Sequence, residues 1–206
     1  MGTYTDRILP RFMDRVMRNE EFGRIRARVA DGLSGQVLEI GFGSGLNVRY
    51  YPTAVDRVLA VEPAMKGREL AERRIAAGKV PVEYVGLDGQ KLDVPDASVD
   101  HVLTTWTLCT IPDAGLALAE IARVLRPGGA LHFAEHGRSP DSKVARWQDR
   151  LTPIQRRIAG GCHLNRAIED LIGASSLELT SLTNYYVESP KPLGYMYEGV
   201  ATKTPN

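Results

Sequence analysis

The stretch that decides the fold of this chain runs from Val37 to Gly45 and reads Val-Leu-Glu-Ile-Gly-Phe-Gly-Ser-Gly. A short aliphatic run ends in three glycines at alternate positions, which is typical of a buried strand that turns sharply beside a ligand. Glycine suits such a turn because it lacks a Cβ atom and tolerates positive φ. The spacing is G-x-G-x-G, whereas a dinucleotide-binding turn reads G-x-G-x-x-G. The stretch therefore predicts a nucleotide-type site and leaves the ligand open.

The composition of the chain narrows the class of protein. The 206 residues are 43% hydrophobic and 25% charged, which is expected of one globular domain with a full core. A formal net charge of +1 provides no general field that would attract nucleic acid. With two cysteines, no secretory signal and no apolar run of about 18 residues, we expect a cytoplasmic protein without a disulfide framework or a membrane span.

Residues 1–34 are expected to form two helices that precede the main domain, residues 35–206. In the first of them Ile8, Phe12 and Val16 recur every four residues, and Leu9, Met13 and Met17 lie beside them in the same apolar stripe. Arginines form a second stripe. The simplest interpretation is a cover helix that packs on the domain and leaves its basic face in water. A substrate lid, or a segment that makes peripheral contact with a membrane surface, is the alternative.

After the glycine turn, strands and helices alternate along the chain. The pattern predicts strands over residues 55–61, 82–85, 99–105 and 130–134, and helices over residues 46–51, 65–77 and 114–125. This alternation predicts a parallel α/β sheet. In such sheets ligands bind beyond the carboxyl ends of the strands, where the strand order reverses.

An acidic residue, Glu62, ends the second expected strand 21 residues after Gly41. A carboxylate at this distance is placed to accept both hydroxyl groups of a ribose. Its other possible role is that of an acidic residue at a helix N-terminus, directly before Pro63. Because the glycine turn and the acid occur in register, the pattern favours a ribose-bearing ligand.

Three features argue against a nicotinamide dinucleotide. The turn lacks the third glycine at the dinucleotide spacing. Glu39 can reach a cationic amino group of a ligand, directly or through water. The third expected strand leads to Asp88 and Gly89, which are placed to contact an adenine edge, although a simple polar turn would use the same residues.

Together these motifs resemble the class I S-adenosylmethionine-dependent methyltransferases. The resemblance is carried by Glu39-x-Gly41-x-Gly43-x-Gly45, Glu62, the Asp88 turn, Ser98-x-Asp100 and Leu125-Arg126-Pro127-Gly128-Gly129. It implies a Rossmann-like α/β fold with a seven-stranded, mostly parallel sheet, an antiparallel last strand and helices on both faces. It also implies S-adenosylmethionine as the cofactor, with S-adenosylhomocysteine as the product.

The same resemblance implies roles for individual residues. Gly41 and Gly43 would approach the methionine part and the ribose, and Gly45 would belong to the same cofactor-binding turn. Glu62, followed by Pro63, would bind the ribose hydroxyls. Asp88 and Gly89 would contact adenine. Thr105 and Trp106, beyond the fourth strand, would lie beside the methionine end.

Further segments look like the animal microsomal alkyl-thiol S-methyltransferases. They are Gly45-x-Asn47-x-x-x-Tyr51-Pro52, Leu108-Cys109, Glu135-His136, Trp147-Gln148 and Gly161-Cys162-x-Leu164-x-Arg166. The resemblance implies methyl transfer to a small apolar acceptor, with a thiol or sulfide favoured. That family begins with a hydrophobic membrane anchor, of which this sequence shows no counterpart. N-, O- or C-methylation of a quinone, phenol or lipid headgroup is the enzymatic alternative. A non-catalytic cofactor-binding module and a dehydrogenase are further alternatives.

Candidate residues for the acceptor site lie after the fifth strand and near the second cysteine. His136 is the first candidate for a general base and His163 the second, since the pKa of histidine lies near operating pH. Cys109 and Cys162 lack C-x-x-C spacing, so we expect no metal site and interpret both as packing residues that line the acceptor pocket. Arg166 either orients an anionic substrate or anchors a turn, and anchoring is favoured.

Overall fold

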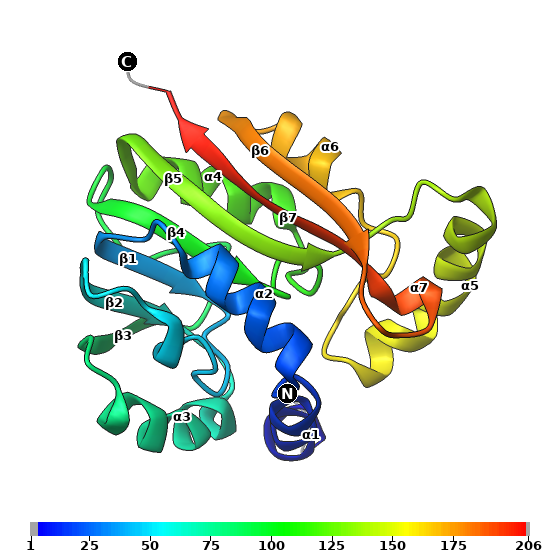
Figure 1. Ribbon diagram of the computed structural model, residues 1–206, viewed down its shortest axis with the longest axis horizontal. Helices are drawn as coiled ribbons and strands as arrows, with labels where there is room; N and C mark the ends of the chain where they lie inside the picture. Colours follow the sequence, from blue (N-terminus) through cyan, green and yellow to red (C-terminus); the bar gives the residue numbers. More distant parts are fainter. Residues whose placement is uncertain (1–3, 205–206) are drawn as a thin grey trace.

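The computed structural model describes residues 4–204, and its centre is a seven-stranded sheet in the order β3-β2-β1-β4-β5-β7-β6 (Figure 1). The strand β7 runs antiparallel to both of its neighbours, and the other strands are parallel to one another. This topology confirms the expected Rossmann-like sheet with an antiparallel last strand.

The elements have the following bounds. The strands are β1 Gly35–Ile40, β2 Val55–Val61, β3 Val82–Gly86, β4 Val99–Thr105, β5 Leu125–His136, β6 Leu177–Tyr186 and β7 Tyr195–Lys203. The helices are η1 Tyr4–Ile8, α1 Leu9–Val16, α2 Glu20–Ala30, η2 Val48–Tyr50, α3 Met65–Ala77, α4 Ala114–Val124, α5 Ser142–Ile158, α6 Ile168–Gly173 and α7 Lys191–Gly194. Residues 1–3 of the expected N-terminal segment and residues 205–206 of the expected main domain lie outside the described residues.

Helices cover both faces of the sheet (Figure 1). On one face, Ile25 and Val29 of α2 join a core that includes Val58 of β2. On the other face, the core contains Ile121 of α4 and Ile172 of α6. Successive strand side chains point to opposite faces, so a sheet buried on both sides needs the continuous apolar strands that the sequence contains.

The strand order reverses between β1 and β4, which makes this the switch point of the sheet. Ile40 of β1 pairs with Thr104 of β4, and both strands end at the same edge. The fold therefore brings the glycine turn after β1 next to the residues that follow β4.

Two expected elements differ from the structure. The helix expected over residues 46–51 is only the 3-10 turn Val48–Tyr50, because the side chains of Asn47 and Tyr51 turn inward to Glu39. The strand expected over residues 130–134 is longer and begins directly after α4, where Leu125 pairs with Val99 of β4.

The outward face of α1 also differs from the expectation. Ile8, Phe12 and Val16 are 55%, 60% and 43% exposed, whereas the buried side chains of α1 are Leu9 and Asp14. Leu9 therefore packs on the domain as expected, whereas Ile8, Phe12 and Val16 point outward, because polar contacts of Asp14 fix the rotation of the helix. Among the described residues, no helix has the length and apolarity required to cross a membrane.

Candidate functional site

The glycine turn after β1 has the open backbone that a close ligand requires. Gly41, Gly43 and Gly45 have φ values of 78°, 56° and 73°, which side-chain-bearing residues rarely adopt. A Cβ atom on Gly41 would overlap the side chain of Thr107. At Gly43 the nearest atom to such a Cβ is the carbonyl oxygen of Gly41, 3.8 Å away, so space remains beside the backbone. This cradle fits the expected cofactor.

Glu62 ties the glycine turn to the end of β2. Its carboxylate accepts hydrogen bonds from the backbone N–H groups of Gly43, at 2.6 Å, and Ala64, at 2.7 Å. Burial raises the pKa of Glu62, and the two N–H groups oppose that effect. Each carboxylate oxygen keeps an unused lone pair, so the side chain can also accept ribose hydroxyls. Pro63, which follows it, is exposed.

Glu39 lies beneath the turn and is completely buried. One of its oxygens accepts a hydrogen bond from Asn47 Nδ2 at 2.9 Å, and the other accepts one from the Tyr51 hydroxyl. Burial raises the pKa of Glu39 to about 7, and these two bonds partly offset that rise. The protein itself therefore uses both oxygens of the carboxylate that was expected to face the cofactor.

The raised pKa of Glu39 predicts a pH-dependent stability. Because the folded pKa of about 7 exceeds the ordinary value of 4.5, stability from this group is full below pH 4.5 and is lost as pH rises through 7. The unfolding free energy of a Glu39→Gln variant, relative to the unmodified protein, should increase by about 3 kcal/mol from pH 4.5 to 8. Urea unfolding at several pH values measures the difference, and a constant difference would contradict the assignment.

The turn after β3 supplies the residues expected to contact adenine. Asp88 is exposed, and its Oδ1 accepts a hydrogen bond from the backbone N–H of Gln90 at 2.9 Å. Gly89 is buried, and a Cβ atom there would lie 2.6 Å from Ile40 Cγ2. Gly89 is therefore required for packing, while Asp88 remains available to a ligand.

At the end of β4, Thr105 and Trp106 join a buried polar network that sequence analysis missed. Arg26 of α2 donates hydrogen bonds to Asn47 Oδ1, at 2.9 Å, and to Thr105 Oγ1, at 3.0 Å. Its guanidinium lies 4.8 Å from the centre of the Trp106 ring. Trp106 has a φ of 52°, an uncommon conformation for such a residue. No motif of the sequence pointed to Arg26, whose partners Asn47 and Thr105 are distant in the chain.

On the other side of the switch point, three reactive side chains meet. The Nε2 atom of His136 lies 3.1 Å from the Sγ atom of Cys162, and these atoms and the Cys109 sulfur all lie within 4.8 Å of one another. All three residues are buried. Both cysteines are buried, as expected of packing residues, but the sequence spacing did not predict that they lie together beside His136. Among the described residues, His136 Nδ1 is buried and has no hydrogen-bond partner.

The three groups shift one another's proton affinity. The Cys109 thiol and then His136 stabilise the Cys162 thiolate and lower its pKa, although burial opposes them. Burial would lower the pKa of His136, but Cys162 and Glu135 raise it above its ordinary value. Burial raises the pKa of Cys109. The protonation of His136 is therefore coupled to that of Cys162, and His136 becomes neutral above its raised pKa.

The second candidate histidine and Arg166 hold the loop that carries Cys109. His163 is partly exposed, and its Nδ1 lies 3.2 Å from the Cys109 carbonyl oxygen. Arg166 donates hydrogen bonds to the carbonyl oxygens of Leu108 and Ile111, the latter at 2.7 Å. These contacts engage the Arg166 guanidinium as an anchor of the loop.

The helix α1 lies beside the end of α2, at the bottom of the view in Figure 1. At one end Asp14 accepts a hydrogen bond from Ser44 in the glycine turn, at 2.6 Å, and forms an ion pair with Arg74, at 2.8 Å. At the other end Tyr4 donates a hydrogen bond to the Ile158 carbonyl at the end of α5, at 2.7 Å. The helix thus joins the glycine turn to the segment that leads to Cys162.

Comparison with known proteins is consistent with this site. A family model described as a methyltransferase domain matches residues 38–133. Human thiol S-methyltransferase TMT1B is 34% identical over 171 residues, which cover 79% of this chain and 68% of that protein. Human thiol S-methyltransferase TMT1A is 36% identical over 141 residues, which cover 66% of this chain and 57% of that protein. The chain thus spans between about half and two thirds of these relatives.

Other relatives and structures are more distant. A phosphatidylethanolamine N-methyltransferase of Cereibacter sphaeroides is 27% identical, over 72% of this chain and 73% of that protein. The crystal structure of a Bacillus halodurans protein described as a methyltransferase has a TM-score of 0.75 at 15% identity, covering 89% of this chain and 99% of that one, and shares the fold. The chain therefore belongs to the class I S-adenosylmethionine-dependent methyltransferases, as a relative of the thiol S-methyltransferases TMT1A and TMT1B.

Proposed function

We propose that this enzyme transfers the methyl group of S-adenosylmethionine to the sulfur of a small apolar thiol. The relatives TMT1A and TMT1B, both thiol S-methyltransferases, support this acceptor class. The structural observation that carries the proposal is the buried His136 Nδ1 atom, which has no partner among the described residues. A thiol proton would satisfy this atom at the moment of transfer.

In this proposal the residues at the switch point hold the cofactor, which supplies a methyl group on a sulfonium. Glu62 accepts the ribose hydroxyls, and Asp88 contacts adenine. Trp106 lies beside the methionine end, and the backbone cradle at Gly43 admits the ligand. Each of these residues lies at the carboxyl end of a different strand or in the turn after it, so the sheet brings them to one edge.

On the acceptor side, His136 takes up the proton of the thiol. The bound cofactor would supply a methyl carbon that accepts the electron pair left on the acceptor sulfur, and the leaving sulfur would keep the electron pair of its own bond to that carbon. A thiol with an ordinary pKa near 8.5 is largely protonated at neutral pH, so a nearby base speeds the reaction. Exclusion of water and in-line alignment of the two sulfur atoms with the methyl carbon supply the remaining rate acceleration.

An acceptor panel tests the proposed function. Purified enzyme with methyl-labelled S-adenosylmethionine should methylate short alkanethiols faster than matched phenols, quinones, amines or phosphatidylethanolamine. Mass spectrometry identifies the methylated atom in each product. Preferred methylation of phosphatidylethanolamine would instead favour the N-methyltransferase alternative, and preferred methylation of a phenol or quinone would favour an O- or C-methyltransferase.

We also propose that the exposed faces of α1 and α5 rest on an anionic membrane surface. Ile8, Phe12 and Val16 of the first helical segment point outward, and so do Ile154 and Ile158 of α5. The Tyr4 bond to Ile158 keeps the two helices adjacent. Exposed apolar side chains on neighbouring helices are typical of segments that lie in a membrane interface.

The distribution of charged residues also favours an anionic membrane as the partner. Residues 4–18 and 142–158 contain nine Lys or Arg and three Asp, although the whole chain has a net charge of only +1. The basic excess is therefore concentrated on the segments that expose the apolar side chains. Such a combination binds anionic lipid through buried apolar area and electrostatic attraction together.

Vesicle sedimentation measures this contact. The protein should sediment with vesicles that contain phosphatidylserine, and more weakly with pure phosphatidylcholine vesicles. An Ile8→Ser/Phe12→Ser variant should lose about tenfold or more of this binding, because two exposed apolar side chains are removed. Leu116→Ser is the matched control, since Leu116 is 54% exposed on α4. Equal binding by both variants would disprove the proposed face.

A further inference from the structure

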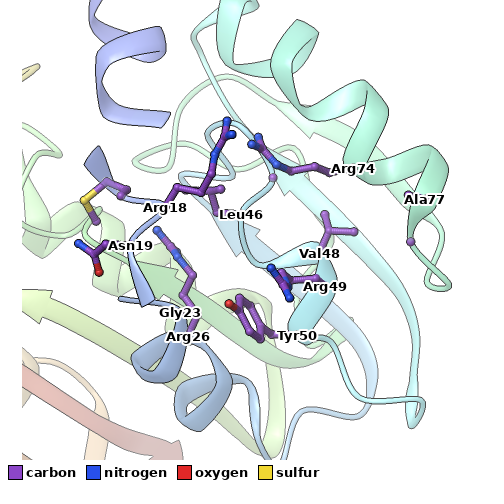
Figure 2. Close-up of a pocket in the computed structure, with 13 residues that line it drawn as sticks. Arg18, Asn19, Gly23, Arg26, Leu46, Val48, Arg49, Tyr50, Arg74 and Ala77 are labelled. Atoms are coloured by element: carbon purple, nitrogen blue, oxygen red, sulfur yellow. The ribbon is translucent and has the colours of Figure 1, made fainter. Parts of the chain in front are cut away.

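A cavity of about 330 Å³ adjoins the glycine turn (Figure 2). It lies between the end of α1, the helix α2, the segment from Gly45 to Tyr50 and the C-terminal end of α3. Its lining residues include four arginines, Arg18, Arg26, Arg49 and Arg74, and no acidic residue. A cavity with such walls has a strongly positive potential.

The arginine charges in this wall are only partly compensated. Asp14, which is not a lining residue, pairs with both Arg18 and Arg74. Arg49 has no ion pair among the described residues, and its guanidinium lies 5.3 Å from the centre of the Tyr50 ring. Figure 2 shows Arg26 and Arg49 on either side of the space, with Arg18 and Arg74 close to each other.

Arg26 gives the clearest indication of a missing ligand. Its side chain is only 6% exposed, and its hydrogen-bond partners, Asn47 and Thr105, are both neutral. Its Nε atom is buried without any partner among the described residues. Burial of a guanidinium costs free energy, and the nearby Glu39 carboxylate offsets part of that cost. An anion in the cavity would place a second negative charge beside Arg26.

We propose that this cavity binds the phosphate group of a small phosphorylated molecule, at a site next to that of the cofactor. Guanidinium groups match phosphate oxygens in pairs, and several of them favour a multiply charged anion. Leu46 and Val48, which also line the cavity, can contact an apolar part of the ligand.

The site is coupled to the cofactor site through shared residues. Gly45 belongs to both the cavity wall and the glycine turn, and Arg26 contacts both the cavity and Thr105. An anion that fixes Arg26 would therefore favour one arrangement of the network beside the methionine end. Binding at the two sites should be linked, and any such linkage is reciprocal.

Titration calorimetry with inorganic pyrophosphate at low salt tests the proposal. The unmodified enzyme should bind one pyrophosphate per chain, both alone and when saturated with S-adenosylhomocysteine. Arg49→Gln should weaken binding by about tenfold or more, since it removes one charged donor. Arg49 is exposed and has no described ion pair, so its replacement should leave the fold intact.

Two further variants sharpen the result. Arg73→Gln is the matched control, because Arg73 is an exposed arginine of α3 outside the cavity wall, and it should bind pyrophosphate normally. Arg26→Lys keeps the positive charge but loses the planar guanidinium group with its paired donors, and it should weaken pyrophosphate binding. Absence of pyrophosphate binding, or equal binding by Arg49→Gln and Arg73→Gln, would overturn the proposal. Competition by S-adenosylhomocysteine would also overturn it and assign the arginines to the cofactor's carboxylate.

Discussion

Replacement of Glu62 by Gln should raise the dissociation constant for S-adenosylhomocysteine by about ten- to a hundredfold, because a charge-assisted contact with the ribose is lost. The amide can offer an oxygen to only one of the two backbone N–H groups, of Gly43 and Ala64, that the carboxylate binds. The geometry of the glycine turn should therefore loosen as well. Calorimetry with the purified variant measures the change.

A matched variant separates this effect from a general change in charge. Glu72→Gln removes an exposed carboxylate of α3, and its affinity for S-adenosylhomocysteine should stay within about twofold. Circular dichroism should show both variants folded. A Glu62→Gln variant that is folded and binds S-adenosylhomocysteine normally would disprove the ribose assignment.

Replacement of His136 by Gln should lower kcat for thiol methylation by about a hundredfold or more, the usual contribution of a general base. Affinity for S-adenosylhomocysteine should remain nearly unchanged, because His136 lies on the acceptor side of the switch point. His163→Gln is the matched control, because the one side-chain hydrogen bond of His163 among the described residues is to the Cys109 carbonyl, and it should change kcat by less than about threefold. Equal losses in the two variants would contradict the role of His136.

The pH profile provides a second test of the same residue. A base acts in its deprotonated form, so kcat/KM should rise with pH through the pKa of His136, which Cys162 and Glu135 raise above its ordinary value. In a Cys162→Ser variant the thiolate is absent, and the rise should move to lower pH. An unchanged profile would show that His136 does not control the reaction.

The position of Glu62 beside the glycine turn could be predicted from sequence because the signals for both are local. The three glycines and Glu62 occur at fixed distances from the ends of two apolar strands, and parallel strands bring such ends to one edge. The short turn Val48–Tyr50 was missed because Asn47 and Tyr51 prefer the buried carboxylate of Glu39 to a helical conformation. This contact depends on the folded sheet.

The acceptor side could not be predicted because its contacts are between distant segments. His136 and Cys162 are 26 residues apart and come from a strand end and a separate loop, so no spacing motif joins them. Likewise, the apolar stripe of α1 predicts a helix but not its rotation, which Ser44 and Arg74 determine through Asp14. In the sequence Arg26 cannot be distinguished from a surface arginine, because its buried partners Asn47 and Thr105 come from distant segments.

The most direct test of the proposed function is the fate of one methyl group. Purified enzyme is incubated with ¹³C-methyl S-adenosylmethionine and a single alkanethiol, and the products are followed by NMR and mass spectrometry. The proposal predicts one equivalent of S-¹³C-methyl sulfide for each S-adenosylhomocysteine formed, and a strongly reduced yield with Glu62→Gln. Formation of S-adenosylhomocysteine without any S-methyl product from a series of thiols between pH 6 and 9 would contradict it.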